Sequence, residues 1–397
     1  MPNREVKIFD VIILGAGASG LMSAIEAGKR GRKVLILDHA RKPGNKIRMA
    51  GGGKCNFTNY DVSDGNYISG NRHFVKSALS RFTQWDFLDM VQQHKVEYEE
   101  RDHGQLFCKN SSKDILNMLL SECDKYNITL RMLCKIKFLQ KKDGSFEVHS
   151  DDMTWSCTSL VVATGGLSIP TSGASPFAYR IAEQFGINVK PVRAGLVPLT
   201  LVPDDKKVWN DLSGIAVDAE LSCNNMVFRE NILITHRGFS GPVILQISNY
   251  WEPGREIYIN WIPGHNLQVL IDDFLENNPA KITRKLLGEH LPHRLVNNLV
   301  DKTILDTKLK SLTKNQLHEL TKAINQFSFV PAGTEGYKTA EVTCGGIDCD
   351  EISSKTFESS KVHGLYFIGE ALDVTGWLGG YNLQWAWSSG YCAGQYI

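Results

Sequence analysis

One short segment, Gly15-Ala-Gly-Ala-Ser-Gly20, limits the fold of this chain more than any other feature. It follows an apolar run from Phe9 to Leu14, which has the pattern of a strand buried on both faces. An alanine-rich helical stretch then continues to Arg30, and Gly31 ends it before a second apolar run, Val34 to Leu37. This order predicts two parallel strands joined by a helix, and therefore an α/β fold.

The glycines of this segment predict a dinucleotide site. Gly15 permits a tight turn, Gly17 lets a pyrophosphate approach the backbone, and Gly20 allows close packing of helix on strand. The helix N-terminus adds free amides and a positive dipole. An acid that binds ribose hydroxyls is expected at Asp38, close to the usual spacing after the glycines. The alternative is a tight turn without a ligand. The residues expected at the dinucleotide are Gly15, Ala16, Gly17, Ala18, Ser19, Gly20, Asp38 and His39.

NAD and FAD share such a turn, and the other end of the chain decides between them. The segment 366–373 is a strand followed by acids, the arrangement with which two-dinucleotide-fold flavoproteins bind the ribityl chain. The segment 379–384 leads into a helix whose amides would face the flavin, where negative charge gathers on reduction. A third glycine turn follows the strand at 160–162. FAD is therefore predicted, with contacts from Ala163, Thr164, Gly165, Gly166, Gly369, Glu370, Asp373, Gly379, Gly380, Tyr381, Asn382 and Leu383.

Three consecutive glycines, Gly51, Gly52 and Gly53, form a further unusual feature. Such a run costs backbone entropy and is rarely kept for packing alone, so it suggests backbone pressed against a flat ligand. A flexible loop is the alternative. The side chains expected to add contacts to the cofactor here are Lys46, Lys54, Cys55, Asn56 and Thr58.

Apolar spacing predicts the remaining elements. Residues 71–95 and 111–126 have helical spacing, and several short strands with a turn at 142–144 fill 128–163. Prolines at 191, 198 and 203 indicate extended connections, followed by short strands to Trp261. The stretch 265–327 reads as helical.

Length and this order of elements predict several domains. A chain of 397 residues exceeds the usual domain size of about 100 to 200 residues. We expect an α/β, Rossmann-like FAD-binding domain of the two-dinucleotide-fold type, built from both chain ends, 1–190 plus 331–397. A β-rich insertion, 191–263, and a small helical insertion, 264–330, would interrupt it.

The charges nearly cancel, with 44 Lys plus Arg against 43 Asp plus Glu. Composition therefore gives no general signature of nucleic-acid or membrane binding. A local excess of nine cations over four acids lies between Lys281 and Lys322. A solvated helical face is the ordinary explanation. An RNA-binding surface, together with Lys42, Lys46, Arg48 and Lys54, is the alternative.

Cysteine usage and hydropathy point to the cytoplasm. The 9 cysteines are odd in number and scattered, which is typical of reduced thiols. Cys344 and Cys349 lack a second ligand pair, so no metal site is expected. No stretch reaches the ~18 apolar residues of a membrane span, and the first residues lack the features of a signal peptide.

These motifs resemble the BaiN/RdsA-type (YhiN-like) flavoproteins over nearly the whole chain. The matching stretches are GAGASG, KPGNKIRMAGGGKCNFTN, ATGGLSIP, THRGFSGPVILQISNYW, AGTEG and FIGEALDVTGWLGGYNLQWAWSSG. The chain departs from the family at Asn45, where an arginine is usual, and at 48–50. The resemblance implies FAD, a Rossmann-like domain from both ends, and β-rich and helical insertions.

The resemblance also implies a reaction. One branch of the family reduces the C=C bond of a steroid enone, another reduces a uridine of 23S ribosomal RNA to dihydrouridine, and this chain is more similar to the second. It thus implies NAD(P)H as a transient electron donor, since no second GxGxxG unit is present, and 23S rRNA as partner. Two alternatives are a reductase or oxidase of a small molecule, and a non-catalytic flavin protein that binds RNA or senses redox state.

Reduction of a conjugated alkene needs a proton donor and a polar group at the carbonyl oxygen. Cys55, in the glycine loop, is one candidate, although it could equally be an inert buried thiol. His236, beside Arg237, is a second candidate, with a structural turn as its alternative. Tyr381 is the third, with aromatic packing as its alternative.

Overall fold

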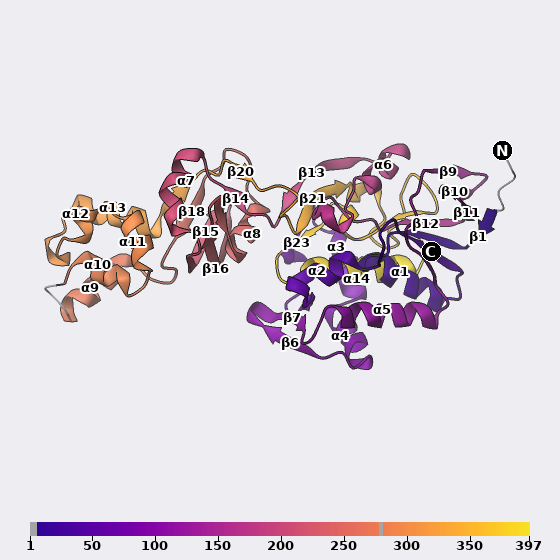
Figure 1. The fold of residues 1–397 in the computed structure, drawn as a ribbon, viewed down its shortest axis with the longest axis horizontal. Coiled ribbons are helices and arrows are strands. Elements are labelled where there is room, and N and C mark those ends of the chain that lie inside the picture. Colours follow the sequence, from indigo (N-terminus) through magenta and orange to yellow (C-terminus); the bar gives the residue numbers. More distant parts are fainter. Residues whose placement is uncertain (1–5, 278–280) are drawn as a thin grey trace. The chain divides into compact units, whose positions relative to one another are not determined.

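The computed structural model describes residues 6–277 and 281–397. These residues form two compact units (Figure 1). Unit 1 comprises Met1–Ala194 and Val342–Ile397, and therefore contains both ends of the chain. Unit 2 comprises Gly195–Glu341 and groups the β-rich and the helical stretch together. Whether those two stretches are separate insertions remains a prediction.

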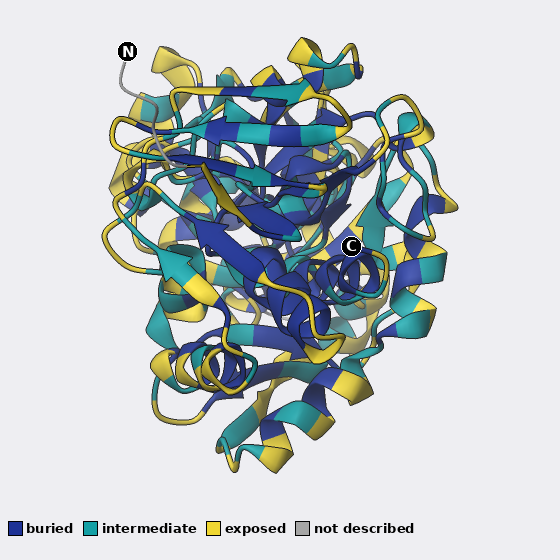
Figure 2. Cartoon of the chain, turned by 90° about the vertical axis from the view of Figure 1, so that its right-hand side faces the viewer, coloured by how far each residue is buried: buried dark blue, intermediate teal, exposed yellow. Residues whose placement is uncertain are grey.

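A five-stranded parallel sheet forms the centre of unit 1. Its order is β22 (Leu365–Phe367), β12 (Ser159–Val162), β2 (Val11–Leu14), β3 (Val34–Leu37) and β8 (Thr129–Arg131). All residues of β2 and β3 are buried, and Figure 2 shows buried strands in dark blue. Continuous apolar runs produce such strands because both faces of a parallel sheet are covered. The predicted Rossmann-type α/β fold is confirmed.

Helices from both chain ends pack beside this sheet. α1 (Ala18–Lys29) contacts both α14 (Tyr381–Gly394) and α5 (Lys113–Lys125). A Cβ on Gly390 would lie 2.5 Å from the Ser19 carbonyl oxygen, and one on Gly394 would lie 2.4 Å from the Glu26 Cβ. The two helices therefore meet backbone to backbone, which only glycine permits here.

Smaller elements complete unit 1. A second sheet has the order β1 (Val6–Ile8), β11 (Thr154–Cys157), β10 (Ser145–His149), β9 (Phe138–Lys142), and a third has the order β4 (Asn56–Asn59), β7 (Gln105–Cys108), β6 (Tyr98–Arg101). Two-stranded pairs join β13 (Val189–Gly195) to β21 (Val342–Ile347), and β5 (Tyr67–Ile68) to β23 (Thr375–Gly376). The remaining helices are α2 (Asn45–Met49), α3 (Phe74–Arg81), α4 (Gln84–Gln93) and α6 (Phe177–Gln184).

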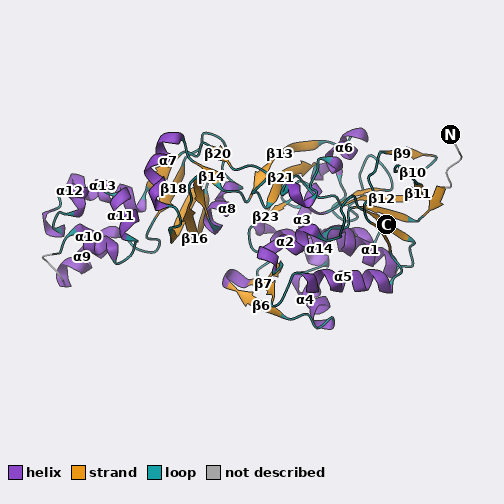
Figure 3. Cartoon of the chain, in the orientation of Figure 1, coloured by secondary structure: helices purple, strands orange, loops and turns teal. Residues whose placement is uncertain are grey.

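Unit 2 combines an antiparallel sheet with helices (Figure 3). The sheet order is β19 (Phe327–Phe329), β18 (Ile257–Asn260), β15 (Ala216–Cys223), β16 (Met226–Ile234), β17 (Gly238–Ser240), β14 (Leu199–Thr200) and β20 (Gly333–Thr334). The helices are α7 (Pro203–Trp209), α8 (Pro242–Ser248), α9 (Leu267–Asn277), α10 (Thr283–Gly288), α11 (His293–Leu299), α12 (Lys302–Leu305) and α13 (Lys314–Asn325). Residues 278–280 of the expected helical stretch, and residues 1–5, lie outside the described part.

Two predictions of secondary structure are wrong in detail. The single helix expected over 71–95 is divided, because Phe82 is extended and Thr83 begins α4 with a capping box to Asp86. Pro203 does not mark an extended connection but begins α7, where its missing N–H costs nothing. Helical periodicity alone does not reveal a helix cap in the middle of a continuous apolar pattern.

No helix in the described part of the chain is long and apolar enough to cross a membrane. All nine cysteines are buried free thiols. Among the described residues, no three His, Cys, Asp or Glu side chains are grouped as a metal site requires.

The contact between α1 and α14 predicts the effect of a single methyl group. Gly390→Ala should lower the free energy of unfolding by about 1–3 kcal/mol, because the new Cβ would overlap the backbone of α1. Urea unfolding of the full chain measures this change. Gly65→Ala is the matched control, since its Cβ would meet only the Ser63 hydroxyl at 3.6 Å. Equal stability of the two variants would contradict the assigned contact.

Candidate functional site

The glycine turn between β2 and α1 leaves one position open. A Cβ on Gly15, which has φ +111°, would lie 2.4 Å from the Ala163 carbonyl oxygen, and one on Gly20 would lie 2.1 Å from the Gly15 oxygen. A Cβ on Gly17 would meet nothing within 4 Å. Gly15 and Gly20 are thus fixed by packing, whereas the space at Gly17 is free for a ligand.

The first turn of α1 can receive an anion. It has no acidic residue and no side-chain cap at Gly17, so its amides and positive dipole remain available. Asp38, at the end of β3, accepts the Ala16 amide at 2.8 Å and the Ala40 amide at 2.7 Å. Its carboxylate therefore holds the turn in place, while 16% of the side chain stays exposed. His39 is half exposed beside it and reaches Gly173.

A polar network joins three distant segments around Glu370. One carboxylate oxygen pairs with the Lys46 ammonium at 2.5 Å. The other accepts the Ser168 hydroxyl at 2.9 Å and the Thr343 amide at 3.1 Å. Lys46 also donates to the Ser168 hydroxyl at 2.7 Å. Lys46 and Glu370 were predicted at the cofactor from separate motifs, and here they are direct partners.

Two members of this network escaped sequence reasoning. Ser168 lies within the stretch ATGGLSIP, but no spacing rule distinguishes it from a turn serine. The Thr343 hydroxyl accepts a hydrogen bond from the Leu167 amide at 2.8 Å. A Cβ on Gly166 would lie only 2.5 Å from this hydroxyl. Only contact across the fold identifies these two residues.

The Thr164 hydroxyl, in the turn after β12, is buried and has no hydrogen-bond partner among the described residues. A buried hydroxyl without a partner costs free energy, so such a group in a native fold calls for an explanation. A ligand beside the 163–166 turn would supply the missing partner.

The C-terminal segment places its glycines directly against the N-terminal motif. A Cβ on Gly369, which has φ +68°, would lie 2.5 Å from the Ser19 hydroxyl. A Cβ on Gly380, at the start of α14, would lie 2.4 Å from the Thr58 carbonyl oxygen. The Asn59 side chain donates to the Gly379 carbonyl at 3.0 Å. The two ends of the chain thus form one surface in unit 1.

Several predicted cofactor residues also have structural tasks. Asn382 exchanges hydrogen bonds with the Gly376 backbone at 2.8 and 2.9 Å and so closes the loop before α14. Thr58 is buried and donates to Gln384 at 2.6 Å. Lys54 donates to the carbonyls of Lys109 and Asn110. Asn56 pairs with Gln105 at 2.9 Å, and Leu383 is half-buried against the core.

The triple-glycine loop follows α2 in a left-handed conformation. Gly51, Gly52 and Gly53 have φ values of 55°, 63° and 89°. A Cβ on Gly51 would overlap the Phe107 ring, whereas Gly52 faces open space. Packing explains the first glycine, and backbone conformation the other two.

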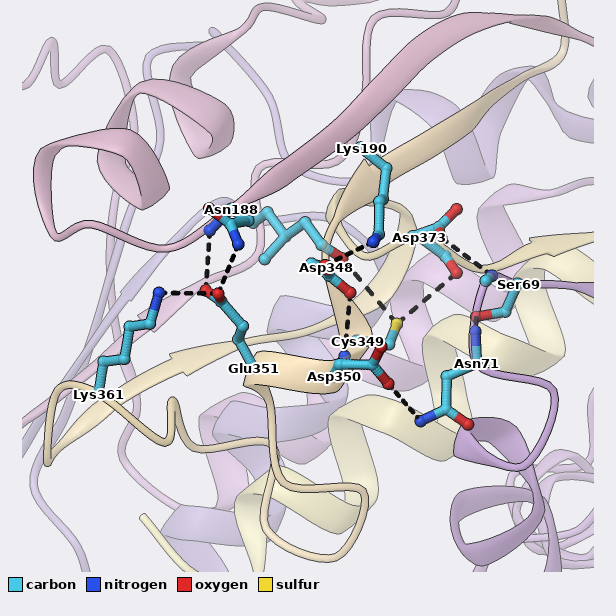
Figure 4. Close-up of polar contacts among 12 residues, drawn as sticks. Ser69, Asn71, Asn188, Lys190, Asp348, Cys349, Asp350, Glu351, Lys361 and Asp373 are labelled. Atoms are coloured by element: carbon cyan, nitrogen blue, oxygen red, sulfur yellow. Dashed lines mark hydrogen bonds and ion pairs between the residues drawn. The ribbon is translucent and has the colours of Figure 1, made fainter.

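Asp373 lies in a group of polar and charged side chains of unit 1 (Figure 4). It accepts the Gly70 amide at 3.0 Å, and burial raises the pKa of its carboxyl group. The neighbouring Asp348 accepts the Lys190 ammonium at 2.7 Å, which raises the pKa of that lysine. Asp350 accepts the Asn71 side chain at 2.9 Å. Hydrogen bonds and ion pairs within the group satisfy these acids.

The three proton-donor candidates have different surroundings. The Cys55 thiol is fully buried, and the hydrogen bond with Cys108 raises its pKa well above the usual range. Tyr381 begins α14, is 7% exposed, and packs edge-on against the Tyr67 ring at 6.2 Å. His236 is exposed and belongs to unit 2.

Comparison with known proteins assigns the chain to a family. The family described as HI0933-like protein Rossmann domain matches residues 9–396. The chain belongs to the HI0933-like family. A ribosomal RNA dihydrouridine synthase of Escherichia coli (strain K12) is 50% identical over 389 residues, 98% of this chain and 97% of the relative.

One further relative and one solved structure are similar to the chain along its length. A 3-dehydro-bile acid delta(4,6)-reductase of Clostridium scindens is 27% identical over 409 residues, 96% of this chain and 97% of the relative. A 3-ketosteroid-delta4-(5alpha)-dehydrogenase from Rhodococcus jostii RHA1 has a TM-score of 0.53 at 12% identity and covers 99% of this chain and 98% of its own. The first extends the family relationship, and the second shows a shared fold.

The HI0933-like chain is an FAD-dependent oxidoreductase. The prediction of a flavoenzyme is confirmed, and the non-catalytic alternative is not supported. Three observations in unit 1 fit FAD: the open space at Gly17, the uncapped first turn of α1, and the unpartnered Thr164 hydroxyl. The two amide-bearing helix starts could hold the pyrophosphate and the flavin, and Glu370 could accept ribityl hydroxyls.

The open space at Gly17 gives a direct test of the pyrophosphate position. Gly17 has φ −90°, which alanine also adopts, so Gly17→Ala should leave the fold of the FAD-free chain unchanged. It should nevertheless lower FAD affinity by about tenfold or more, because the methyl group would occupy ligand space. Visible flavin absorbance after reconstitution measures the affinity, and the melting temperature of the FAD-free chain is the control. Full FAD occupancy in the variant would contradict the assigned position.

Proposed function

We propose that this flavoenzyme reduces a uridine of 23S ribosomal RNA to dihydrouridine, with NAD(P)H as the source of electrons. The observation that carries the proposal is the 50% identity, over 98% of the chain, to a protein named ribosomal RNA dihydrouridine synthase. A Haemophilus influenzae protein with the same name is 46% identical over 390 residues. We also propose a cytoplasmic location, because ribosomal RNA is found there.

The chemistry is an addition of hydride and proton across a C=C bond conjugated to a carbonyl group. Bound FAD supplies the hydride that one alkene carbon receives. The protein must donate the proton to the neighbouring carbon and stabilise the charge that develops on the carbonyl oxygen. The uridine must also leave its stack to reach the site, which an unpaired stretch of RNA makes easier.

Unit 1 holds the residues proposed for FAD, and we assign the proton donor to Tyr381 among the three candidates. Tyr381 directly follows the Gly379-Gly380 turn at the start of α14, in the same unit as Glu370 and Gly17. The Cys55 thiol is fully enclosed in the core. His236 belongs to unit 2, which contributes none of the residues predicted for FAD.

Reduction of a small molecule is the second candidate function. It is supported by the Clostridium scindens relative, whose name specifies a bile-acid reductase and which is 27% identical along the chain. Both reactions would add hydride to a conjugated alkene, so the flavin site serves either substrate. We prefer the RNA substrate because the chain is 50% identical to the Escherichia coli relative and only 27% identical to the Clostridium scindens relative.

Removing the gene from its host tests the substrate. We expect the dihydrouridine content of 23S ribosomal RNA to fall at one nucleotide and to return when the wild-type gene, but not Gly17→Ala, is supplied. Primer-extension or mass-spectrometric mapping of the RNA reads out the nucleotide. Unchanged dihydrouridine in the deletion strain would overturn the proposed substrate and leave the FAD assignment intact.

The proton donor is tested by removing one hydroxyl group. Tyr381→Phe should slow product formation by about 10²- to 10⁴-fold, the usual contribution of general acid catalysis. The FAD content of the protein should stay unchanged. Single-turnover assays with reduced enzyme measure the product. Tyr391→Phe is the matched control, because it removes a hydroxyl from the same helix, where the ring stacks on Phe82. Full activity of Tyr381→Phe would return the role to Cys55 or His236.

A further inference from the structure

Two segments of the helical part of unit 2 are joined by an isolated antiparallel bridge. Ile282 pairs with Lys308, the Thr283 amide donates to the Thr307 carbonyl at 3.1 Å, and the Leu309 amide donates to the Lys281 carbonyl at 3.2 Å. The bridge brings together lysines that are more than twenty residues apart in the chain. We call Lys281, Lys285, Lys308 and Lys310 the basic cluster.

The basic cluster is a local excess of positive charge. The side chains of Lys285, Lys308 and Lys310 are exposed. The acid nearest in sequence, Asp306, is already paired with Arg284 at 2.8 Å. Within the described ranges, no member of the cluster takes part in an ion pair of 4.0 Å or less. The cluster is therefore a local cationic surface on a chain whose total charge is +1.

Lys281 shows that these charges affect one another. Its ammonium lies 4.8 Å from the centre of the Phe274 ring on α9. Partial desolvation lowers the pKa of Lys281, and the neighbouring Lys285 lowers it further, while Glu289 opposes the change. A bound anion would relieve this repulsion.

Unit 2 has four further cations on the helices that follow in the chain. They lie on α11, α12 and α13 and are Arg294, Lys302, Lys314 and Lys322. All four side chains are exposed. None of these four forms an ion pair of 4.0 Å or less with another described residue. A series of such exposed cations matches a polyanion better than a single small anion.

We infer that the basic cluster binds the phosphate backbone of RNA and so anchors the nucleic acid on unit 2. The inference rests on the proposed function, which makes RNA the polyanion that this protein meets. An anchor of this kind contributes affinity without sequence information. It would leave selection of the reduced base to unit 1.

Binding of purified, FAD-loaded full-length protein to in vitro transcribed 23S ribosomal RNA tests the anchor. The test variant is Lys285→Glu/Lys308→Glu/Lys310→Glu, whose side chains are exposed, so the backbone bridge should survive. The control is Lys7→Glu/Lys135→Glu/Lys142→Glu, which makes the same charge change at exposed positions of unit 1. Melting temperature and flavin absorbance verify that both variants fold.

The test variant should bind RNA at least about tenfold more weakly than wild type, and the slope of log affinity against log salt should become shallower by about 2, as three lost single-strand phosphate contacts predict. The control should bind as wild type does. Wild-type affinity in the test variant, or an equal loss in the control, would overturn the inference. The inference would also be overturned if the wild-type protein bound phosphatidylserine vesicles but did not bind RNA.

The readout separates this inference from the proposed reaction. Binding is measured without a reductant, so it does not depend on turnover. RNA binding through the cluster together with unchanged dihydrouridine in the deletion strain would support the anchor and overturn the proposed substrate. Normal dihydrouridine formation by the test variant at unaltered RNA affinity would overturn the anchor and support the substrate.

Discussion

The backbone contact between α1 and α14 is the constraint on which the rest of unit 1 depends. Gly390 and Gly394 let α14 approach α1 at the Ser19 and Glu26 positions, where any side chain would overlap. Only this approach places Gly369 against the Ser19 hydroxyl, and so brings the two dinucleotide motifs to one surface. Because both chain ends share this site, the chain must leave unit 1 for unit 2 and later return. It leaves at the end of β13 and returns at the start of β21, and these two strands pair with each other.

The Glu370 network adds polar links to this packing. The Glu370 side chain is only 19% exposed, and burying a carboxylate without partners costs free energy. Here Lys46, the Ser168 hydroxyl and the Thr343 amide supply those partners. The network ties the helix α2, the turn after β12 and the strand β21 to the C-terminal motif. Thr164, whose buried hydroxyl has no partner among the described residues, lies in the same segment after β12 as Ser168.

Much of unit 1 was predictable because its signals are local. The apolar runs gave β2, β3 and β12, and the glycine spacing gave the turn before α1. The division between α3 and α4 was not predicted, because the Thr83 cap lies inside a continuous apolar pattern. Ser168 and Thr343 were missed because a serine or threonine has no distinctive spacing, and their roles arise from partners far away in the chain.

The sequence by itself determined the strand–turn–helix motif, the flavoprotein family and the list of residues that could surround the cofactor. Glycine conformations and strand burial are set by neighbouring residues, so they can be read locally. Only the tertiary structure decided that Lys46 pairs with Glu370, 324 residues away, that Cys55 is enclosed beside Cys108, and that Lys281 and Lys308 meet at a bridge. These features depend on contacts between distant segments, whose partners no local pattern specifies.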